Sequence, residues 1–161
     1  MKKLLIAAMI ASQAVAIAAS PALAQEAPSA DDRQAVLAVV DGLFAAMLAR
    51  DGAAVTPLVE PQGTVTQVSL APDGSQRITT TPWADFAAGL ARAPAPIRER
   101  LFDPEVRIRG DIAMVWSRYD LSVGDTFSHC GTDLFDLIRR DGRWRMLHVT
   151  YTRERTGCEA R

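Results

Sequence analysis

The sequence predicts an α+β domain in which N-terminal helices cover an antiparallel sheet made mainly by the C-terminal half. Strand-forming residues dominate positions 97–152, and two short turns, Gly124-Asp125 and Asp141-Gly142, join them as consecutive hairpins. Apolar residues at helical spacing between positions 31 and 50 predict the covering helix. Segregation of helices from strands, rather than strict alternation, is typical of α+β folds.

The first 24 residues have the pattern of a secretory signal peptide. Lys2 and Lys3 form a basic start, an apolar run extends from Leu4 to Ala19, and Ala22-Leu23-Ala24 matches an A-x-A cleavage site. The run is short for a membrane-spanning helix, although an uncleaved anchor is the alternative interpretation. We therefore expect cleavage after Ala24 and a mature protein that is periplasmic or secreted.

The 161 residues suffice for one ordinary domain, which we place at residues 31–161 after a flexible lead over 25–30. Removal of the signal removes both lysines and leaves sixteen arginines against nineteen acids, a formal charge near −3. The arginines are scattered among acids, which argues against nucleic acid as a partner. No later stretch is long and apolar enough to span a membrane, so we expect no membrane contact after cleavage.

Asp31 or Asp32 is predicted to cap the first helix, which should end at Arg50 with Gly52 near its C-terminal cap. A shorter apolar turn, Ala53–Val59, should follow and stop at Pro61. The apolar positions that recur at helical spacing are Val36, Val39, Val40, Leu43, Phe44, Met47 and Leu48.

The middle of the chain predicts a hairpin and then a second helix. Two strands, Gly63–Leu70 and Ser75–Thr80, flank a four-residue turn that contains proline and glycine. Thr81 as N-cap and Pro82 at the first helical position should start the helix, which ends before the prolines that follow.

The rest of the sheet is predicted as one interrupted strand and a meander. The first strand, Ile97–Arg109, contains Asp103-Pro104, and proline inside a strand implies a bulge or a sheet edge. The meander consists of Ile112–Val123, Thr126–Arg140 and Arg143–Thr152.

The two tight turns predict a register. If Arg140 pairs with Arg143, Phe135 lies opposite His148, and the first hairpin likewise places Trp116 opposite Asp133. One face then carries Met114, Trp116, Arg118, His129, Asp133, Phe135, Leu137, Trp144, Met146 and His148. Both faces are largely apolar, so we expect both to be covered, one by helices and the other by a pocket or a partner subunit. A bulge would exchange the faces beyond it.

The two cysteines of the chain, Cys130 and Cys158, are predicted to form a disulfide bond. The signal peptide would deliver them to an oxidising compartment, where paired cysteines are usually bridged. Two free thiols are the alternative. A metal site is not expected, because two Cys and two His lack a familiar ligand spacing.

Four features together resemble the NTF2-like superfamily, which includes SnoaL-like, ketosteroid-isomerase-like and lumazine-binding-type small secreted proteins. They are the long N-terminal helix, the Thr81-Pro82-Trp83 helix start, the strand opening at residues 110–116 and the hairpin at residues 141–146. The resemblance implies a cystatin-like cone, in which a curved antiparallel sheet wraps around N-terminal helices and encloses a pocket. It also implies a homodimer joined through the sheet.

The resemblance leaves function open, because members of this superfamily include isomerases, cyclases, dehydratases and proteins without known activity. Our first hypothesis is a non-catalytic module that holds a small apolar or aromatic ligand, or an accessory subunit, without a cofactor. The candidate pocket residues are Trp83, Phe86, Trp116, Tyr119, His129 and Tyr151.

The second hypothesis is an isomerase, cyclase or dehydratase. On the predicted register, Arg118, Asp133 and His148 share one face of three adjacent strands, where Asp133 and His148 would form an acid–base pair oriented by Arg118. An ion-paired polar cluster on an exposed or dimer-facing sheet has the same composition and is the ordinary alternative. No phosphate-binding loop, nucleophile elbow or metal-binding helix motif is present in the sequence.

Overall fold

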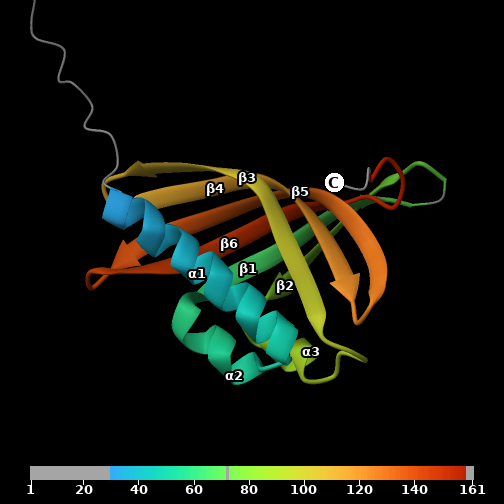
Figure 1. Cartoon of the computed structure of the whole chain (residues 1–161), viewed down its shortest axis with the longest axis horizontal. Helices are drawn as coiled ribbons and strands as arrows, with labels where there is room; N and C mark the ends of the chain where they lie inside the picture. The colour runs from blue at the N-terminus through green and yellow to red at the C-terminus, as the bar shows by residue number, and fades with distance from the viewer. Residues whose placement is uncertain (1–29, 72, 159–161) are drawn as a thin grey trace, which may run out of the picture.

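The computed structural model describes residues 30–71 and 73–158, in which a helical layer covers one face of a strongly curved sheet (Figure 1). The predicted signal peptide and nearly all of the predicted lead lie outside these residues. No helix in the described part of the chain is long and apolar enough to cross a membrane. The elements are α1 (Ala30–Ala49), α2 (Gly52–Val55), η1 (Thr56–Leu58), β1 (Val59–Leu70), β2 (Gln76–Pro82), α3 (Trp83–Leu90), β3 (Ile97–Arg109), β4 (Ile112–Val123), β5 (Thr126–Arg140) and β6 (Arg143–Arg153).

The six strands form one sheet in the order β2-β1-β6-β5-β4-β3. Every neighbouring pair is antiparallel except β1 and β6, which run parallel. The predicted meander is therefore confirmed, and the parallel pairing adds the β1–β2 hairpin to the edge that β6 would otherwise expose. The sheet does not close on itself, and it bends around the side of α1 (Figure 1).

The helices attach to the concave face of the sheet through apolar side chains. The buried face of α1 consists of Val36, Val39, Val40, Leu43, Ala46 and Met47. Phe44 of α1 also packs edge-on against Phe135 of β5, with 6.0 Å between ring centroids. Helix α3 is anchored by buried Trp83, whose Nε1 donates a hydrogen bond to the carbonyl oxygen of Leu147 at 3.0 Å. These contacts bury the apolar side chains of both helices against the sheet.

The helix boundaries differ from the sequence prediction at two caps. The left-handed residue after α1 is Arg50, with φ of 56°, rather than Gly52. Gly52 instead starts α2, which is capped by the carboxylate of Asp51 through two backbone amides. Thr81 and Pro82 belong to β2, and α3 begins one residue after the predicted start, without a side-chain cap.

The strand boundaries follow the prediction more closely. Strand β1 starts at Val59 and passes through Pro61, whereas we expected a stop at this proline. Strand β3 is an edge strand, as expected from Asp103-Pro104, and its register shifts between Phe102 and Glu105. Asp103 takes a φ of 53° at this irregularity. Proline lacks the amide that a central strand would need, so the sheet accommodates it at the edge.

The second hairpin begins in the predicted register and then leaves it. Arg140 pairs with Arg143 and Leu137 pairs with Met146, as expected from the Asp141-Gly142 turn. A bulge at Leu147 then shifts β6 by one residue. Phe135 therefore lies opposite Val149, and the predicted pairing with His148 is wrong.

The first hairpin has a bulge on β5 at Ser128, since Leu121 pairs with His129 and Ser122 with Phe127. Trp116 consequently pairs with Leu134, and the predicted pairing with Asp133 is wrong. Because side chains alternate along a strand, this one-residue shift exchanges the two faces of β4 relative to β5.

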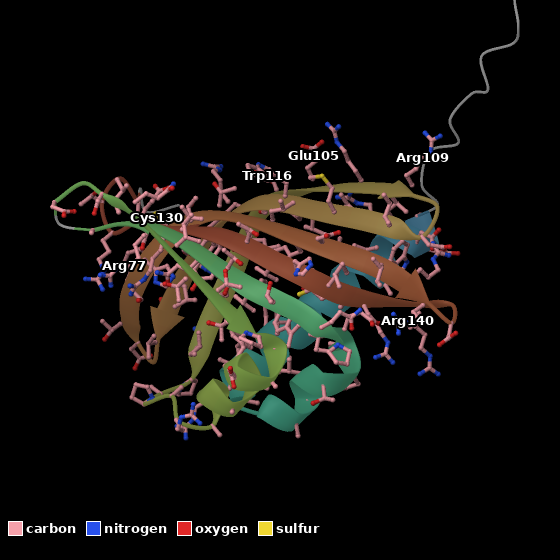
Figure 2. All side chains as sticks on the ribbon, turned by 180° about the vertical axis from the view of Figure 1, so that it is seen from behind. Arg77, Glu105, Arg109, Trp116, Cys130 and Arg140 are labelled. Atoms are coloured by element: carbon pink, nitrogen blue, oxygen red, sulfur yellow. A yellow bond between two sulfur atoms is a disulfide. The ribbon has the colours of Figure 1, made fainter. Side chains whose placement is uncertain are left out.

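The bulges decide which residues lie on the concave face. Phe135 and Trp144 share the buried side, as predicted. The β4 residues that join them are Val115 and Tyr119, which are buried, rather than Trp116, which is 49% exposed. Figure 2 shows Trp116 on the outer side of the sheet, away from the helices. The pairing of two copies through this outer face stays a prediction.

The structure joins Cys130 to Cys158 by the predicted disulfide bond. The backbone of Cys130 also exchanges hydrogen bonds of 3.0 and 2.9 Å with Glu154, one residue beyond the partner that the simple register predicted. The bond and the bridge together hold the segment after β6 against β5.

Candidate functional site

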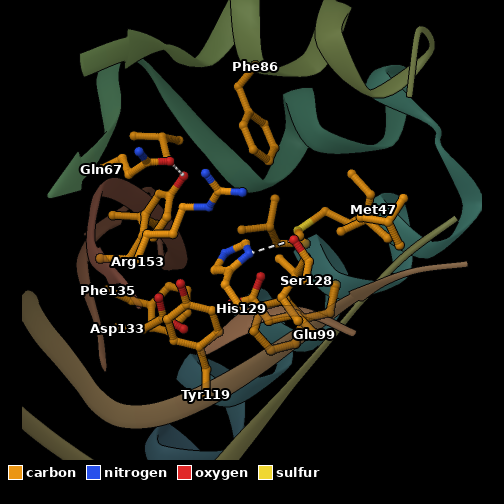
Figure 3. Close-up of a pocket in the computed structure, with 18 of the residues that line it drawn as sticks. Met47, Gln67, Phe86, Glu99, Tyr119, Ser128, His129, Asp133, Phe135 and Arg153 are labelled. Carbon is orange, nitrogen blue, oxygen red and sulfur yellow. Dashed lines mark hydrogen bonds between the residues drawn. The ribbon is translucent and has the colours of Figure 1, made fainter. Parts of the chain in front are cut away.

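A cavity of about 440 Å³ lies between α1, α3 and the concave face of the sheet. Its apolar wall combines side chains of both helices with side chains of five strands. These residues are Leu43, Phe44, Met47, Val65, Trp83, Phe86, Ile97, Leu121, Val123, Phe135 and Val149. Figure 3 shows Met47 and Phe86 on one side of this space and a cluster of polar side chains on the other.

The polar part of the lining comes from every long strand of the sheet. It consists of Gln67 of β1, Glu99 of β3, Tyr119 of β4, Ser128, His129 and Asp133 of β5, and Tyr151 and Arg153 of β6. The curvature of the sheet turns these neighbouring strands toward a common interior, so residues from positions 67 to 153 meet there (Figure 3).

Two acids of the lining, Asp133 and Glu99, influence each other. Asp133 is 2% exposed, and its Oδ2 has no hydrogen-bond partner among the described residues. Burial raises the pKa of Asp133 to about 7, although its interaction with Glu99 acts in the opposite direction. Burial and the charge of Asp133 raise the pKa of Glu99 well above its ordinary value. Burial therefore favours the neutral form of Glu99, while Asp133 is close to its own midpoint at neutral pH.

His129 is the buried base of the site. Its Nδ1 lies 2.9 Å from the hydroxyl of Ser128, and its Nε2 has no partner among the described residues. Burial lowers the pKa of His129 to about 4, and the positive charges of Arg153 and Arg155 contribute to the shift. The imidazole is therefore neutral at physiological pH, and its Nε2 is a buried polar atom without a hydrogen bond among the described residues.

Two tyrosines pack around His129, and each donates its hydroxyl hydrogen bond to another group of the protein. Tyr119 donates to the carbonyl oxygen of Thr152 at 2.8 Å, and Tyr151 donates to Oε1 of Gln67 at 3.0 Å. Burial raises the pKa of both phenols, so both are neutral. The two hydroxyl oxygens can therefore accept a hydrogen bond from a ligand more readily than the hydroxyls can donate one.

Arg153 supplies a positive charge to the lining. In Figure 3 its guanidinium projects into the space between Phe86 and His129. No described carboxylate forms an ion pair with this guanidinium, in contrast to Arg140, which pairs with buried Glu60 at 3.2 Å.

The structure places five of the six predicted pocket residues in the cavity lining: Trp83, Phe86, Tyr119, His129 and Tyr151. The sixth, Trp116, lies on the outer face, and its assignment to the pocket is corrected. The cause is the bulge at Ser128, which the sequence pattern did not reveal.

The predicted grouping of Arg118, Asp133 and His148 is also corrected. Asp133 lines the cavity, but Arg118 lines a groove on the outer side of the sheet. The Nδ1 atom of His148 accepts a hydrogen bond from the backbone amide of Thr64 at 3.2 Å and lies 3.1 Å from the hydroxyl of the same residue. His148 pairs with Asp136, next to the inward pair of Phe135 and Val149, so it points away from the cavity.

Sequence reasoning missed Glu99 and Arg153. A weak signal existed for Glu99, because it occupies the same face of β3 as Ile97 and Leu101, where apolar residues are expected. The sequence contains no such signal for Arg153, because its side chain faces inward only as a result of the bulge at Leu147. In the described part of the chain, no three His, Cys, Asp or Glu residues are arranged to hold a metal ion.

No protein-family model matches the sequence, and no functionally curated protein matches it. Solved structures do match. An NTF2-like protein of unknown function from Shewanella baltica is 17% identical with a TM-score of 0.61, over 81% of this chain and 100% of that chain. A Nostoc punctiforme protein with a cystatin-like fold is 9% identical with a TM-score of 0.64, over 81% and 97%. An NTF2-like protein from Novosphingobium aromaticivorans is 16% identical with a TM-score of 0.61, over 81% and 85%.

Proposed function

The chain has the NTF2-like, or cystatin-like, fold, and from it we propose an exported module that binds a small molecule in the cavity between α1, α3 and the sheet. The observation that carries the proposal is the cavity itself, whose volume of about 440 Å³ is typical of sites for small ligands. Its walls are mainly apolar, while its polar groups converge on one side.

The lining indicates an amphipathic ligand. Phe44, Phe86 and Trp83 offer aromatic surface to an apolar or aromatic body, whose transfer from water stabilises the complex by roughly 25 cal/mol per Å². The unpartnered atoms of His129 and Asp133 would orient polar groups of the ligand. This division of roles is common in small-molecule sites.

Export is supported by two independent features. The N-terminal sequence has the signal-peptide pattern, and the disulfide bond between Cys130 and Cys158 is of the kind that persists in oxidising compartments.

A cavity-filling substitution tests the binding proposal. We expect small molecules to co-purify with the protein and a screen of aromatic metabolites to raise its melting temperature, as measured by native mass spectrometry and thermal shift. Leu121→Trp should abolish these shifts, because Leu121 lines the cavity. The matched control is Ile112→Trp on the same strand, where the side chain is 60% exposed on the outer face. Equal shifts for the two variants, or none for the unmodified protein, would contradict the proposal.

A second candidate function is a proton-transfer enzyme of the isomerase type, and Asp133 favours it. A buried carboxyl whose pKa is near 7 and which faces a cavity can act as a general base at physiological pH. Glu99, whose pKa burial raises well above its ordinary value, would donate a hydrogen bond beside it when protonated. The hydroxyl of Tyr119 is already committed to Thr152, so it would have to rearrange to stabilise an oxyanion.

Deuterium exchange tests this candidate. We would follow the α-hydrogens of 2-tetralone, an aromatic ketone, by NMR in deuterated buffer. An enzyme should accelerate exchange above the buffer rate, Asp133→Asn should remove the acceleration, and Asp136→Asn should retain it, because Asp136 lies on the opposite face of β5. Exchange that is unaffected by Asp133→Asn would eliminate Asp133 as the base.

A further inference from the structure

Arg153 is the feature of the cavity that the proposed function leaves unused. It is the last residue of β6 and is only partly exposed, and among the described residues it is the one cation in the lining. A guanidinium that is partly withdrawn from water loses hydration, and protein sites usually compensate with a carboxylate. Nothing of that kind pairs with Arg153 among the described residues, whereas Arg100 pairs with Asp120 and Arg139 pairs with Asp32.

The backbone around Arg153 is held in place on both sides. In β1, Ser69 is its partner in the parallel pairing with β6. The following residue, Glu154, is bridged to Cys130 of β5, and the disulfide bond to Cys158 closes the tail. The guanidinium therefore extends from an anchored strand end, not from a free tail, which reduces the entropy lost when it binds an ion.

The direction of the side chain is consistent with a role inside the cavity. Figure 3 shows the guanidinium directed between Phe86 and His129. Its charge lowers the pKa of His129, second to burial, and it opposes the rise in the pKa of Tyr119 and Tyr151. These effects place the charge among the polar lining and next to aromatic surface that could cover the body of a ligand.

We infer that Arg153 binds the anionic group of the ligand, and that the ligand is a small monocarboxylate with an apolar or aromatic body. This inference rests on the proposed binding function and adds a substrate class to it. A planar guanidinium can bind a carboxylate through two parallel hydrogen bonds. A single cation balances a single negative charge, and the described residues of the lining include no second cation for a phosphate dianion.

At mildly acidic pH, the other titratable groups of the lining carry little negative charge that would repel a bound anion. They are Glu99, Tyr119, His129, Asp133 and Tyr151. Both tyrosines and His129 are neutral at pH 6, and Asp133 is mainly protonated there. Burial raises the pKa of Glu99 well above its ordinary value, which favours its neutral form as well. The charge of the lining at this pH is therefore that of Arg153, and a carboxylate with an ordinary pKa near 4 is ionised.

The test compares two probes of the same shape, 2-naphthoate and 2-naphthamide, by isothermal titration calorimetry at pH 6. The full protein with its disulfide bond is measured beside Arg153→Gln and Arg153→Lys. The matched control is Arg155→Gln, which removes the same charge from an exposed residue of the same segment that does not line the cavity.

We expect naphthoate to bind the unmodified protein at least tenfold more tightly than naphthamide. Arg153→Gln should weaken naphthoate at least tenfold and naphthamide less than threefold, so that the preference disappears. Arg153→Lys should retain part of the preference, and Arg155→Gln should change neither affinity by more than about twofold.

Different failures have different meanings. If both probes bind the unmodified protein equally well, or if Arg153→Gln weakens both equally, the cavity binds ligands but Arg153 does not select an anion. If neither probe binds, both the inference and the proposed function are contradicted. If Arg153→Gln does not fold, the comparison of probes on the unmodified protein and on Arg153→Lys still tests the inference: equal affinities on the unmodified protein, or a full preference in Arg153→Lys, would contradict it.

Discussion

Replacement of Asp133 by asparagine should reduce the loss of stability that accompanies a rise in pH. Asp133 has a folded-state pKa of about 7 against an ordinary value of 3.8, because burial disfavours its charge. The folded protein therefore holds this proton more tightly than the unfolded chain does. The contribution to stability is complete below pH 4 and is lost as the pH rises toward 7.

The magnitude follows from the slope of the linkage relation. Between pH 5 and pH 7 the folded state carries about one more proton than the unfolded state, so stability falls by about 1.4 kcal/mol per pH unit. Ionisation of Asp133 thus costs about 2–3 kcal/mol across this interval. Glu99 acts in the same direction because its pKa is also raised, and the two carboxyls titrate as a pair.

The assay is urea denaturation at pH 5, 6, 7 and 8, followed by circular dichroism. Relative to the unmodified protein, Asp133→Asn should gain about 2–3 kcal/mol of unfolding free energy as the pH is raised from 5 to 8. Asp136→Asn, the control on the outward side of β5, should show no such gain. If the curves of Asp133→Asn and the unmodified protein run parallel, the burial argument for Asp133 is refuted.

Three further predictions concern the cavity and its frame. His129→Gln should gain about 2 kcal/mol of stability on going from pH 8 to pH 5, relative to the unmodified protein, because the pKa of His129 is about 4 in the fold and near 6.5 when unfolded. Urea titrations that show no gain would contradict this. The double variant Cys130→Ser/Cys158→Ser should lose about 3–4 kcal/mol, from the chain entropy of a loop spanning 28 residues, and should become insensitive to reductant; a loss below 1 kcal/mol would count against it. Gly63→Ala should destabilise the fold by at least 2 kcal/mol, since its Cβ would lie 1.7 Å from the carbonyl oxygen of Leu147, whereas Gly89→Ala, which meets nothing within 4 Å, should not.

The sequence predicted the fold because its signals were local. Apolar residues at helical spacing, a bulge-prone Asp103-Pro104 and an Asp141-Gly142 turn each act within a few residues, and each appears in the structure where expected. The disulfide bond was also predictable, since only one pairing of two cysteines exists. The parallel pairing of β1 with β6 was not, because it joins segments more than 80 residues apart without a turn to specify it.

The candidate site was predictable only in part. Tyr119 and Tyr151 were assigned to the pocket from their aromatic character, and they line it together with Asp133. The prediction that Trp116 lines the pocket was wrong because the bulge at Ser128 turns its side chain outward. The prediction that His148 joins Asp133 was wrong because the bulge at Leu147 shifts β6 by one residue. A strand has a repeat of two, so one extra residue exchanges every face beyond it.

The order of elements and the identity of the covering helices were therefore determined by the sequence itself, through short-range patterns. The tertiary structure alone decided which side chains enter the cavity. Two bulges and the curvature of the sheet brought Glu99, Asp133 and Arg153 from three strands into one interior. The charge states of the two carboxyls also arise there, because burial away from water depends on how distant strands and helices pack.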